Sequence, residues 1–191
     1  MSHRPVTRKE HVRKWELSQL LSASKDTERR CAAIESLSRK YAALPSMRFE
    51  RNTTQIIRTQ EWIADGRSIH RGGDESAWMR LAEALEAKDE LNLVHGDLCV
   101  RNLIWSKERG CCLAVDWEPD LIQVRGNKQV FKVTKGYIQP NDMGLSEPFS
   151  VHSDRYAFAR CLEQVRKIEL LSKKDDTLAP LYQESVRKAF R

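Results

Sequence analysis

The chain has 191 residues, of which 40% are hydrophobic and 31% are charged, and its formal net charge is +6. This composition excludes a disordered or fibrous protein and predicts a globular chain with a real core. No apolar run reaches membrane-spanning length and the N-terminus lacks an apolar signal core, so we expect no membrane partner. The basic residues are scattered among acidic ones, so we expect no nucleic-acid partner.

The cysteines show no metal-binding or disulfide pattern. None forms a Cys-x-x-Cys pair and no histidine stands at zinc-finger spacing; they are Cys31, Cys99, Cys111, Cys112 and Cys161. An odd number of cysteines in a chain of this size favours a reducing compartment. We therefore predict a cytoplasmic protein, with secretion into a host cell left open as an alternative.

The first part of the chain predicts a short sheet with one helix. Residues 11–16 are typical of a strand, and apolar residues recur at helical spacing between 24 and 44, where Pro45 follows as a stop signal. Two further strand-like runs follow at 47–49 and 55–57, and then the segment 61–63. Gly66 then marks a turn.

The second part predicts mainly helices around one hairpin. Residues 75–88 carry an apolar stripe at helical spacing. Two short apolar runs between 103 and 115 flank a polar turn and predict a β-hairpin. Residues 118–152 lack clear periodicity, whereas 154–171 and 176–190 favour helices.

Polar residues with chemical potential surround the predicted hairpin. Asp97 follows a short apolar run, and a carboxylate at a strand end can accept a hydroxyl proton. Asn102 and Asp116 are oxygen ligands that the hairpin brings together. Mg²⁺ binds through one or two carboxylates plus substrate phosphates, so this layout indicates metal-assisted phosphoryl transfer.

The segments 95–102 and 116–118 read His-Gly-Asp-Leu-Cys-Val-Arg-Asn and Asp-Trp-Glu. They resemble the catalytic loop and metal-binding motif of the protein-kinase-like superfamily, H-x-D-L-x-x-x-N and D-F-G. The resemblance implies that Asp97 is the catalytic base, and that Asn102 and Asp116 are Mg²⁺ ligands. It also implies ATP as the phosphate donor and Mg²⁺ as the cofactor.

Two downstream segments support this resemblance, which covers about residues 90–165. Residues 135–141 resemble the end of a protein-kinase activation segment, and 153–158 resemble the start of the buried central helix. In that family the helix aspartate, here Asp154, holds the backbone of the catalytic loop.

The N-terminal half of the chain resembles kinases less specifically than the segment 90–165 does. In kinases a strand lysine grips the ATP phosphates and pairs with a helix glutamate. Lys14 is our choice for that lysine, with Arg13 and Lys9 as rivals. For the glutamate we prefer Glu35 over Glu28, which lies too near the helix start.

The segment Glu61-Trp62-Ile63 falls where the adenine-binding hinge of a kinase lies. Trp62 could equally be a core residue. Ile104, just after the catalytic loop, is also expected among the nucleotide-binding residues.

The resemblance implies an α+β, bilobal protein-kinase-like fold with a reduced N-lobe and a mainly helical, truncated C-lobe. We expect residues 1–191 to form a single domain. Residues 1–64 would make the reduced N-lobe and hinge, and 65–191 the C-lobe.

Four departures from the protein-kinase pattern have consequences. No glycine precedes Gly66, so a glycine-rich phosphate loop is missing. Gly96 replaces the arginine that usually binds an activation-loop phosphate, so activity should not depend on phosphorylation of the 118–140 segment. Cys99 replaces a catalytic-loop lysine, and Arg101 is expected to take over its catalytic role. Glu118 replaces the last glycine of D-F-G.

Three functions remain open. A minimal Ser/Thr protein kinase with a protein substrate is favoured by residues 136–141 and 153–158. A small-molecule kinase of the aminoglycoside or choline type is favoured by H-G-D and D-W-E. A pseudokinase, which binds without catalysis, is favoured by the missing glycine-rich loop.

Overall fold

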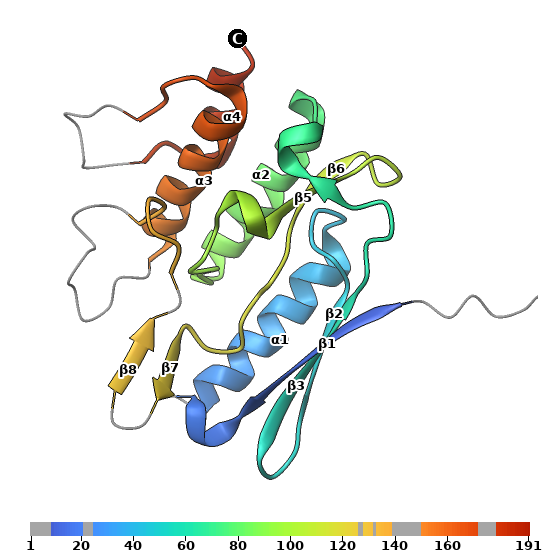
Figure 1. Cartoon of the computed structure of the whole chain (residues 1–191), viewed down its shortest axis with the longest axis vertical. Coiled ribbons are helices and arrows are strands. Elements are labelled where there is room, and N and C mark those ends of the chain that lie inside the picture. Colours follow the sequence, from blue (N-terminus) through green and yellow to red (C-terminus); the bar gives the residue numbers. More distant parts are fainter. Residues whose placement is uncertain (1–8, 21–24, 126–127, 132, 139–149, 172–178) are drawn as a thin grey trace, which may run out of the picture.

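A computed structural model describes residues 9–20, 25–125, 128–131, 133–138, 150–171 and 179–191 of the chain. Over these residues the fold is α+β, with small antiparallel sheets and four helices (Figure 1). One three-stranded sheet and helix α1 make up the first part, and the remaining helices gather in the second. This architecture confirms the predicted fold class.

The N-terminal sheet contains β1 (Glu10–Glu16), β2 (Met47–Arg51) and β3 (Gln55–Glu61) in the antiparallel order β1-β3-β2. Arg13 lies opposite Arg58 and Trp15 lies opposite Ile56. Directly opposed residues of an antiparallel pair share one face of the sheet. Because Trp15, Ile56 and Arg58 are buried, this face is the interior one, and Arg13 belongs to it.

Helix α1 (Lys25–Lys40) packs beside β2 and contributes Ile34 and Leu37 to the main core. It ends four residues earlier than the apolar pattern predicted. The chain turns directly after it, with the Tyr41 carbonyl accepting a hydrogen bond from the Leu44 amide at 3.0 Å. The predicted helix is thus confirmed with a shorter C-terminal end.

The second part is built on helices α2 (Glu75–Glu90), α3 (Val151–Arg166) and α4 (Tyr182–Ala189). The Asp74 side chain caps α2 by accepting the Ala77 amide at 2.9 Å. A second sheet has the order β4-β5-β6, and its β5–β6 hairpin confirms the prediction. Its strands are β4 (Arg67–Ser68), β5 (Leu103–Ser106) and β6 (Cys111–Ala114).

One hydrophobic core runs from α1 through α2 to α3 and α4. Its aromatic centre is formed by Trp78, Phe158 and Tyr182. The ring centroids of Trp78 and Phe158 lie 5.7 Å apart, and those of Phe158 and Tyr182 lie 5.2 Å apart, both edge to face. Packing in this core holds α2, α3 and α4 against one another. The loop after α2 is held between these helices.

The boundaries of α3 differ from the sequence prediction. Ser150 and Ser153 form a reciprocal capping box, so the helix begins three residues earlier than expected. Lys167 adopts a left-handed conformation with φ of 58° and ends the helix. Of the predicted 176–190 helix, α4 is confirmed, and residues 172–178 lie outside the described part.

The structure also contains elements that the periodicity did not reveal. Strands β7 (Ile122–Arg125) and β8 (Lys128–Phe131) form a hairpin within the segment predicted to be irregular. Three short 3-10 turns connect other elements, at Leu17–Gln19, Ile69–Arg71 and Val100–Asn102. The Gly-Asn dipeptide between the runs 122–125 and 128–131, each of which contains a β-branched residue, was the available signal for the β7–β8 hairpin.

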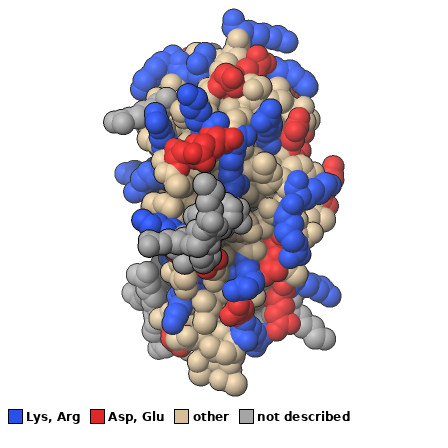
Figure 2. Space-filling model, turned by 90° about the vertical axis from the view of Figure 1, so that its right-hand side faces the viewer, with Lys and Arg blue, Asp and Glu red and all other residues tan. Residues whose placement is uncertain are grey.

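Figure 2 shows Lys and Arg side chains interspersed with Asp and Glu over one face of the molecule. All five cysteines are buried as free thiols. Among the described helices, none is long and apolar enough to cross a membrane.

Candidate active site

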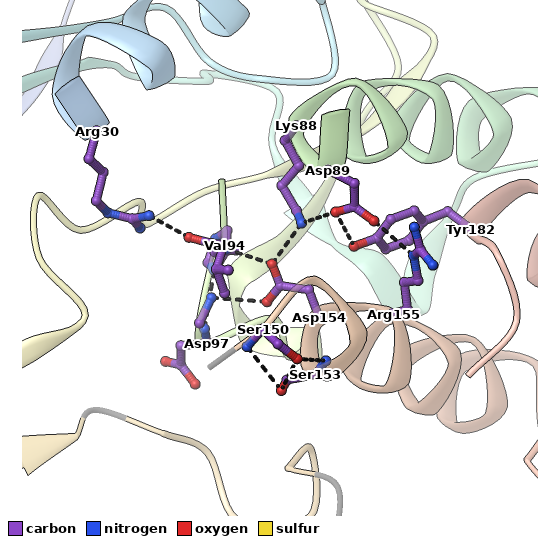
Figure 3. A network of polar contacts seen from close by, with 12 residues as sticks. Arg30, Lys88, Asp89, Val94, Asp97, Ser150, Ser153, Asp154, Arg155 and Tyr182 are labelled. Carbon is purple, nitrogen blue, oxygen red and sulfur yellow. Dashed lines mark hydrogen bonds and ion pairs between the residues drawn. The ribbon is translucent and has the colours of Figure 1, made fainter. Parts of the chain in front are cut away.

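The loop after α2 is held by a buried carboxylate from α3. Asp154, only 1% exposed, accepts the His95 amide at 2.6 Å and the Gly96 amide at 3.0 Å (Figure 3). Two charge-assisted bonds from one side chain fix the backbone just before Asp97. This is the contact that the resemblance implied for Asp154, and it is confirmed.

Asp154 belongs to a buried ionic network that joins three helices. The Nζ atom of Lys88, in α2, lies 2.8 Å from Oδ2 of Asp154. It also lies 2.6 Å from Oδ1 of Asp89, the next residue in the chain after Lys88. Asp89 also accepts from Arg155 of α3 at 2.8 Å and from the Tyr182 hydroxyl of α4 at 3.2 Å. Figure 3 shows these side chains converging to one side of the segment from Val94 to Asp97. The position of the loop therefore depends on the packing of all three helices.

Charge in this network is balanced. Burial alone would raise the pKa of Asp154, but Lys88, His95 and the amide donors hold that pKa below its ordinary value. Burial lowers the pKa of His95, so its ring is neutral at pH 7. The ring Nε2 lies 3.0 Å from the Val115 carbonyl and Nδ1 accepts the Asp97 amide at 3.3 Å. A carbonyl can only accept, so these partners assign the proton to Nε2.

Gly96 adopts φ of +84°, a left-handed conformation that side chains with a Cβ rarely adopt. The sequence marked this residue as the loss of a phosphate-binding arginine. The structure adds a second reason for glycine, because the backbone turns sharply between His95 and Asp97.

Asp97 receives hydrogen bonds on both carboxylate oxygens. The Asn102 amide nitrogen donates to Oδ2 at 3.1 Å and to the Asp97 carbonyl at 2.8 Å. The Thr134 hydroxyl donates to Oδ1 at 2.7 Å and accepts from Arg101 at 3.1 Å. Arg101 thus reaches Asp97 through Thr134. Sequence reasoning did not include Thr134 among the site residues; its hydroxyl in a segment poor in hydroxyl groups was the only signal.

Asp116 follows Val115, whose amide and carbonyl both bond to residues of the 95–102 loop. The Val115 amide donates to the Asn102 carbonyl at 2.9 Å, and the Val115 carbonyl faces His95. Asp116 itself has φ of +65°, a strained conformation for a residue with a side chain. The hairpin therefore brings the backbone just before Asp116 next to Asn102, whose side chain is bonded to Asp97.

Two arginines of the N-terminal sheet approach Asp116. Arg13 lies 2.9 Å and Arg58 3.1 Å from its Oδ1 atom. Arg58 is 1% exposed and also donates to the Trp117 carbonyl at 2.6 Å. Burial lowers the pKa of Arg58 and the Asp116 carboxylate opposes that shift. Arginine stays protonated in proteins, so Asp116 lies between two positive charges. Arg58 had not been predicted from the sequence.

The structure corrects the predicted pair of Lys14 and Glu35. Lys14 is exposed on the outer face of β1, because successive strand residues point to opposite sides and Arg13 points inward. Glu35 accepts the Phe49 amide at 2.6 Å, and its other oxygen lies 3.6 Å from Arg39. The prediction that Lys14 faces Glu35 is therefore wrong.

The other candidates for this pair are also engaged elsewhere. Glu28 pairs with Arg51 at the surface. Lys9 is exposed, and its carbonyl accepts the Trp62 amide at 3.0 Å. Of the three candidate cations, only Arg13 contacts Asp116 among the described residues.

The predicted hinge follows directly on β3. Glu61 ends this strand and pairs with Arg109 at 2.6 Å. Trp62 is 54% exposed, which excludes a core role. Ile63 and Ile104 meet at the hinge turn: a Cβ on Gly66 would lie 3.4 Å from Ile63 Cγ2 and 3.2 Å from Ile104 Cδ1. Glu61 lies three residues beyond Arg58 along β3. The predicted hinge therefore begins about 10 Å along the strand from Arg58.

The side chains near Asp116 suit a hard divalent cation. The Asn102 amide nitrogen donates to Asp97, so its carbonyl oxygen is the atom that can ligate a metal. Together with the Asp116 carboxylate it offers oxygen donors of the kind that Mg²⁺ takes. The described residues contain no group of three or more His, Cys, Asp or Glu able to hold a metal. Within the described part of the chain, the oxygen donors beside the hairpin are the Asp116 carboxylate and the Asn102 amide.

Two hollows lie on the α3 side of Asp97. A small pocket at Asp97 is lined partly by Leu98, Thr134, Tyr137 and Ala157. Tyr137 also lines a cavity of about 650 Å³, together with Lys135, Gly136, Arg160, Glu163, Gln164, Ile168, Glu169 and Leu171. Residues 139–141 of the predicted activation segment lie outside the described part.

The chain matches no protein-family model and no curated protein. Among solved structures it is similar to the Cydia pomonella granulovirus kinase PK-1, with a TM-score of 0.57 and 14% sequence identity. The match covers 96% of this chain and 78% of that kinase. The chain therefore has a protein-kinase-like fold with reduced lobes.

Proposed function

We propose that the chain is an ATP-dependent phosphotransferase that uses Mg²⁺. The observation that carries this proposal is the hydrogen-bonded set in which Asn102 joins Asp97 to the strand end before Asp116. A base and two oxygen donors within one short loop and hairpin match what phosphoryl transfer needs. The kinase-like fold supports the proposal.

Asp97 is the proposed catalytic base. Thr134 and Asn102 donate to its two carboxylate oxygens and so fix the plane of the carboxylate. An acceptor hydroxyl placed beside it can hydrogen-bond to a remaining lone pair and transfer its proton as the phosphate arrives. Arg101 supports this arrangement through Thr134.

Asn102 and Asp116 are the proposed metal ligands. When bound, Mg²⁺ would neutralise charge on the ATP phosphates. Arg13 and Arg58 lie on the same face of the N-terminal sheet; the partly exposed Arg13 can hold phosphate oxygens, and the buried Arg58 balances the charge of Asp116. The adenine is assigned to Glu61, Trp62 and Ile63 of the hinge and to Ile104.

A protein hydroxyl, Ser or Thr, is the proposed acceptor. The cavity beside Tyr137 supports this choice, because it shares Tyr137 with the Asp97 pocket, is lined in part by residues of α3 and offers both charged and apolar side chains. Such a surface can accommodate residues that flank a phosphorylated hydroxyl.

Two alternatives have observations in their favour. Glu118 is buried and ion-paired, so the D-W-E motif typical of small-molecule kinases has a structural role here. A binding module without catalysis is favoured by the two arginines that already occupy Asp116 Oδ1.

Incubation with γ-labelled ATP and Mg²⁺ tests the proposal. One series uses a generic acceptor protein and another uses a panel of aminoglycosides and amino alcohols. We expect labelled protein, with label lost in Asp97→Asn and retained in Glu90→Gln, an exposed carboxylate on α2. Label only on a small molecule would establish the first alternative. ATP binding without transfer to any acceptor would establish the second.

A further inference from the structure

The inward-facing cation of β1 pairs with a carboxylate from the metal-binding segment itself. Arg13 NH1 lies 2.7 Å from Glu118 Oε1, and Glu118 is 5% exposed. Glu28 and Glu35 of α1 are bound elsewhere, to Arg51 and to the Phe49 amide. Helix α1 therefore does not supply the acidic partner of Arg13.

Helix α1 supplies a cation instead. Arg30 donates to the Glu118 carbonyl at 2.9 Å and to the Val94 carbonyl at 2.6 Å, the second bond being visible in Figure 3. Burial of its guanidinium group lowers the pKa of Arg30 to about 10, so it stays charged at neutral pH. Arg58 binds the Trp117 carbonyl from the sheet side. The backbone of residues 117–118 is thus fixed from two directions, which sets the Glu118 side chain opposite Arg13.

The guanidinium group of Arg13 is held in one orientation and still has N–H donors for a ligand. Its NH1 atom contacts both Asp116 and Glu118, and its guanidinium group lies 5.2 Å from the Trp15 ring centroid. A guanidinium has five N–H donors, so Nε and NH2 remain able to bind phosphate oxygens. Stacking on an aromatic face restricts the plane of the group.

The carboxylate of Glu118 allows Arg13 to stay in place without relying on Asp116. An arginine held by Asp116 alone would compete for the residue that the proposed function assigns to the metal. Glu118 keeps Arg13 in place independently of Asp116. We propose that Glu118 is a positioning residue that holds Arg13 against the nucleotide phosphates, in the place where a helix glutamate was expected; this inference rests on the proposed function.

The inference predicts which part of the nucleotide is affected. Removing the charge of Glu118 should loosen Arg13 and weaken phosphate contacts, while leaving the hinge unchanged. Hydrogen bonds to charged groups carry enough energy that ATP binding should weaken about tenfold to 100-fold in Glu118→Gln. Adenosine, which has no phosphate, should bind as it does to the wild type.

The test is calorimetric titration of the full chain with ATP and with adenosine, both with and without Mg²⁺. Glu35→Gln is the matched control, since its amide oxygen can still accept the Phe49 amide, and its ATP affinity should equal that of the wild type. Arg13→Lys, which keeps the positive charge, should retain more ATP affinity than Arg13→Met. Arg13 is 33% exposed, so these two variants test the phosphate contact of Arg13 even where Glu118→Gln does not fold.

The outcomes separate the two proposals. A wild type that binds neither ATP nor adenosine overturns the proposed function, and the inference with it. A wild type that binds ATP, combined with unchanged affinity in Glu118→Gln or Arg13→Met, overturns the inference alone. Equal losses for ATP and adenosine in Glu118→Gln would also overturn it, because they would indicate general unfolding of the cleft.

Discussion

The buried pair of Lys88 and Asp154 should dominate the stability of the catalytic loop. Replacing Lys88 by Met keeps most of the side-chain volume but leaves Asp154 without its ammonium partner in the interior. Lys88 is 0% exposed and Asp154 1% exposed, so water cannot replace the lost contact. Removing one member of a buried pair typically costs about 3–5 kcal/mol. For a chain of this size, that corresponds to a fall in Tm of about 6–20 °C.

The loss of folding stability caused by Lys88→Met should depend on pH in a defined direction. In the wild type the lowered pKa of Asp154 contributes stability that is present above the unfolded pKa, near 4, and is lost as pH falls through the folded pKa. In Lys88→Met the pKa of Asp154 rises, because burial is no longer opposed by that ammonium group. The stability gap between variant and wild type should therefore be widest at neutral pH and narrow on acidification.

Urea denaturation from about pH 7.5 down to about pH 4.5 measures this gap. The matched control is Lys188→Met, which removes an exposed ion pair with Glu184 at 2.8 Å and should change stability by about 0.5 kcal/mol or less. A Lys88→Met cost as small as that of the control would refute the reasoning. A gap that stays constant with pH would show that Asp154 is not the group left unpaired.

Three further predictions concern the loop and its surroundings. Thr134→Val removes the donor to Asp97 Oδ1, so kcat should fall about tenfold or more while ATP affinity is unchanged, as steady-state kinetics would show; an equal kcat would contradict the role of this bond. Phosphatase treatment of the wild type should leave its rate unchanged. Gly96→Ala forces a Cβ into the left-handed region and should cost about 1–2 kcal/mol in urea denaturation, together with activity. Gly110→Ala, in the hairpin turn at φ of +59°, should cost similar stability and no activity.

Much of this site was predictable because its residues lie close together in sequence. Asn102 and Asp116 flank one hairpin whose two short apolar runs are visible in the sequence, so local pattern alone brought the strand end before Asp116 next to Asn102. The backbone role of Asp154 came from a resemblance that extends to the start of α3. Helix α3 nevertheless began earlier, because Ser150 and Ser153 form a capping box that apolar spacing does not register.

The site predictions that were wrong or missing depend on tertiary geometry. Lys14 and Arg13 are both cations in one strand, and only the packing of Trp15 decides which of them faces inward. Sequence spacing cannot reveal that Glu118 reaches Arg13 across the fold, or that Glu35 is already used by the Phe49 amide. Arg58 had no motif at all, since its role arises from the register between β1 and β3.

The most direct test of the whole account is a crystal structure of the chain with Mg²⁺ and a non-hydrolysable ATP analogue. The account predicts a metal about 2.0–2.1 Å from oxygens of Asp116 and Asn102. It also predicts the terminal phosphate toward Asp97 and the adenine at Glu61–Ile63. A nucleotide bound elsewhere, or a metal without contact to Asp116, would contradict it.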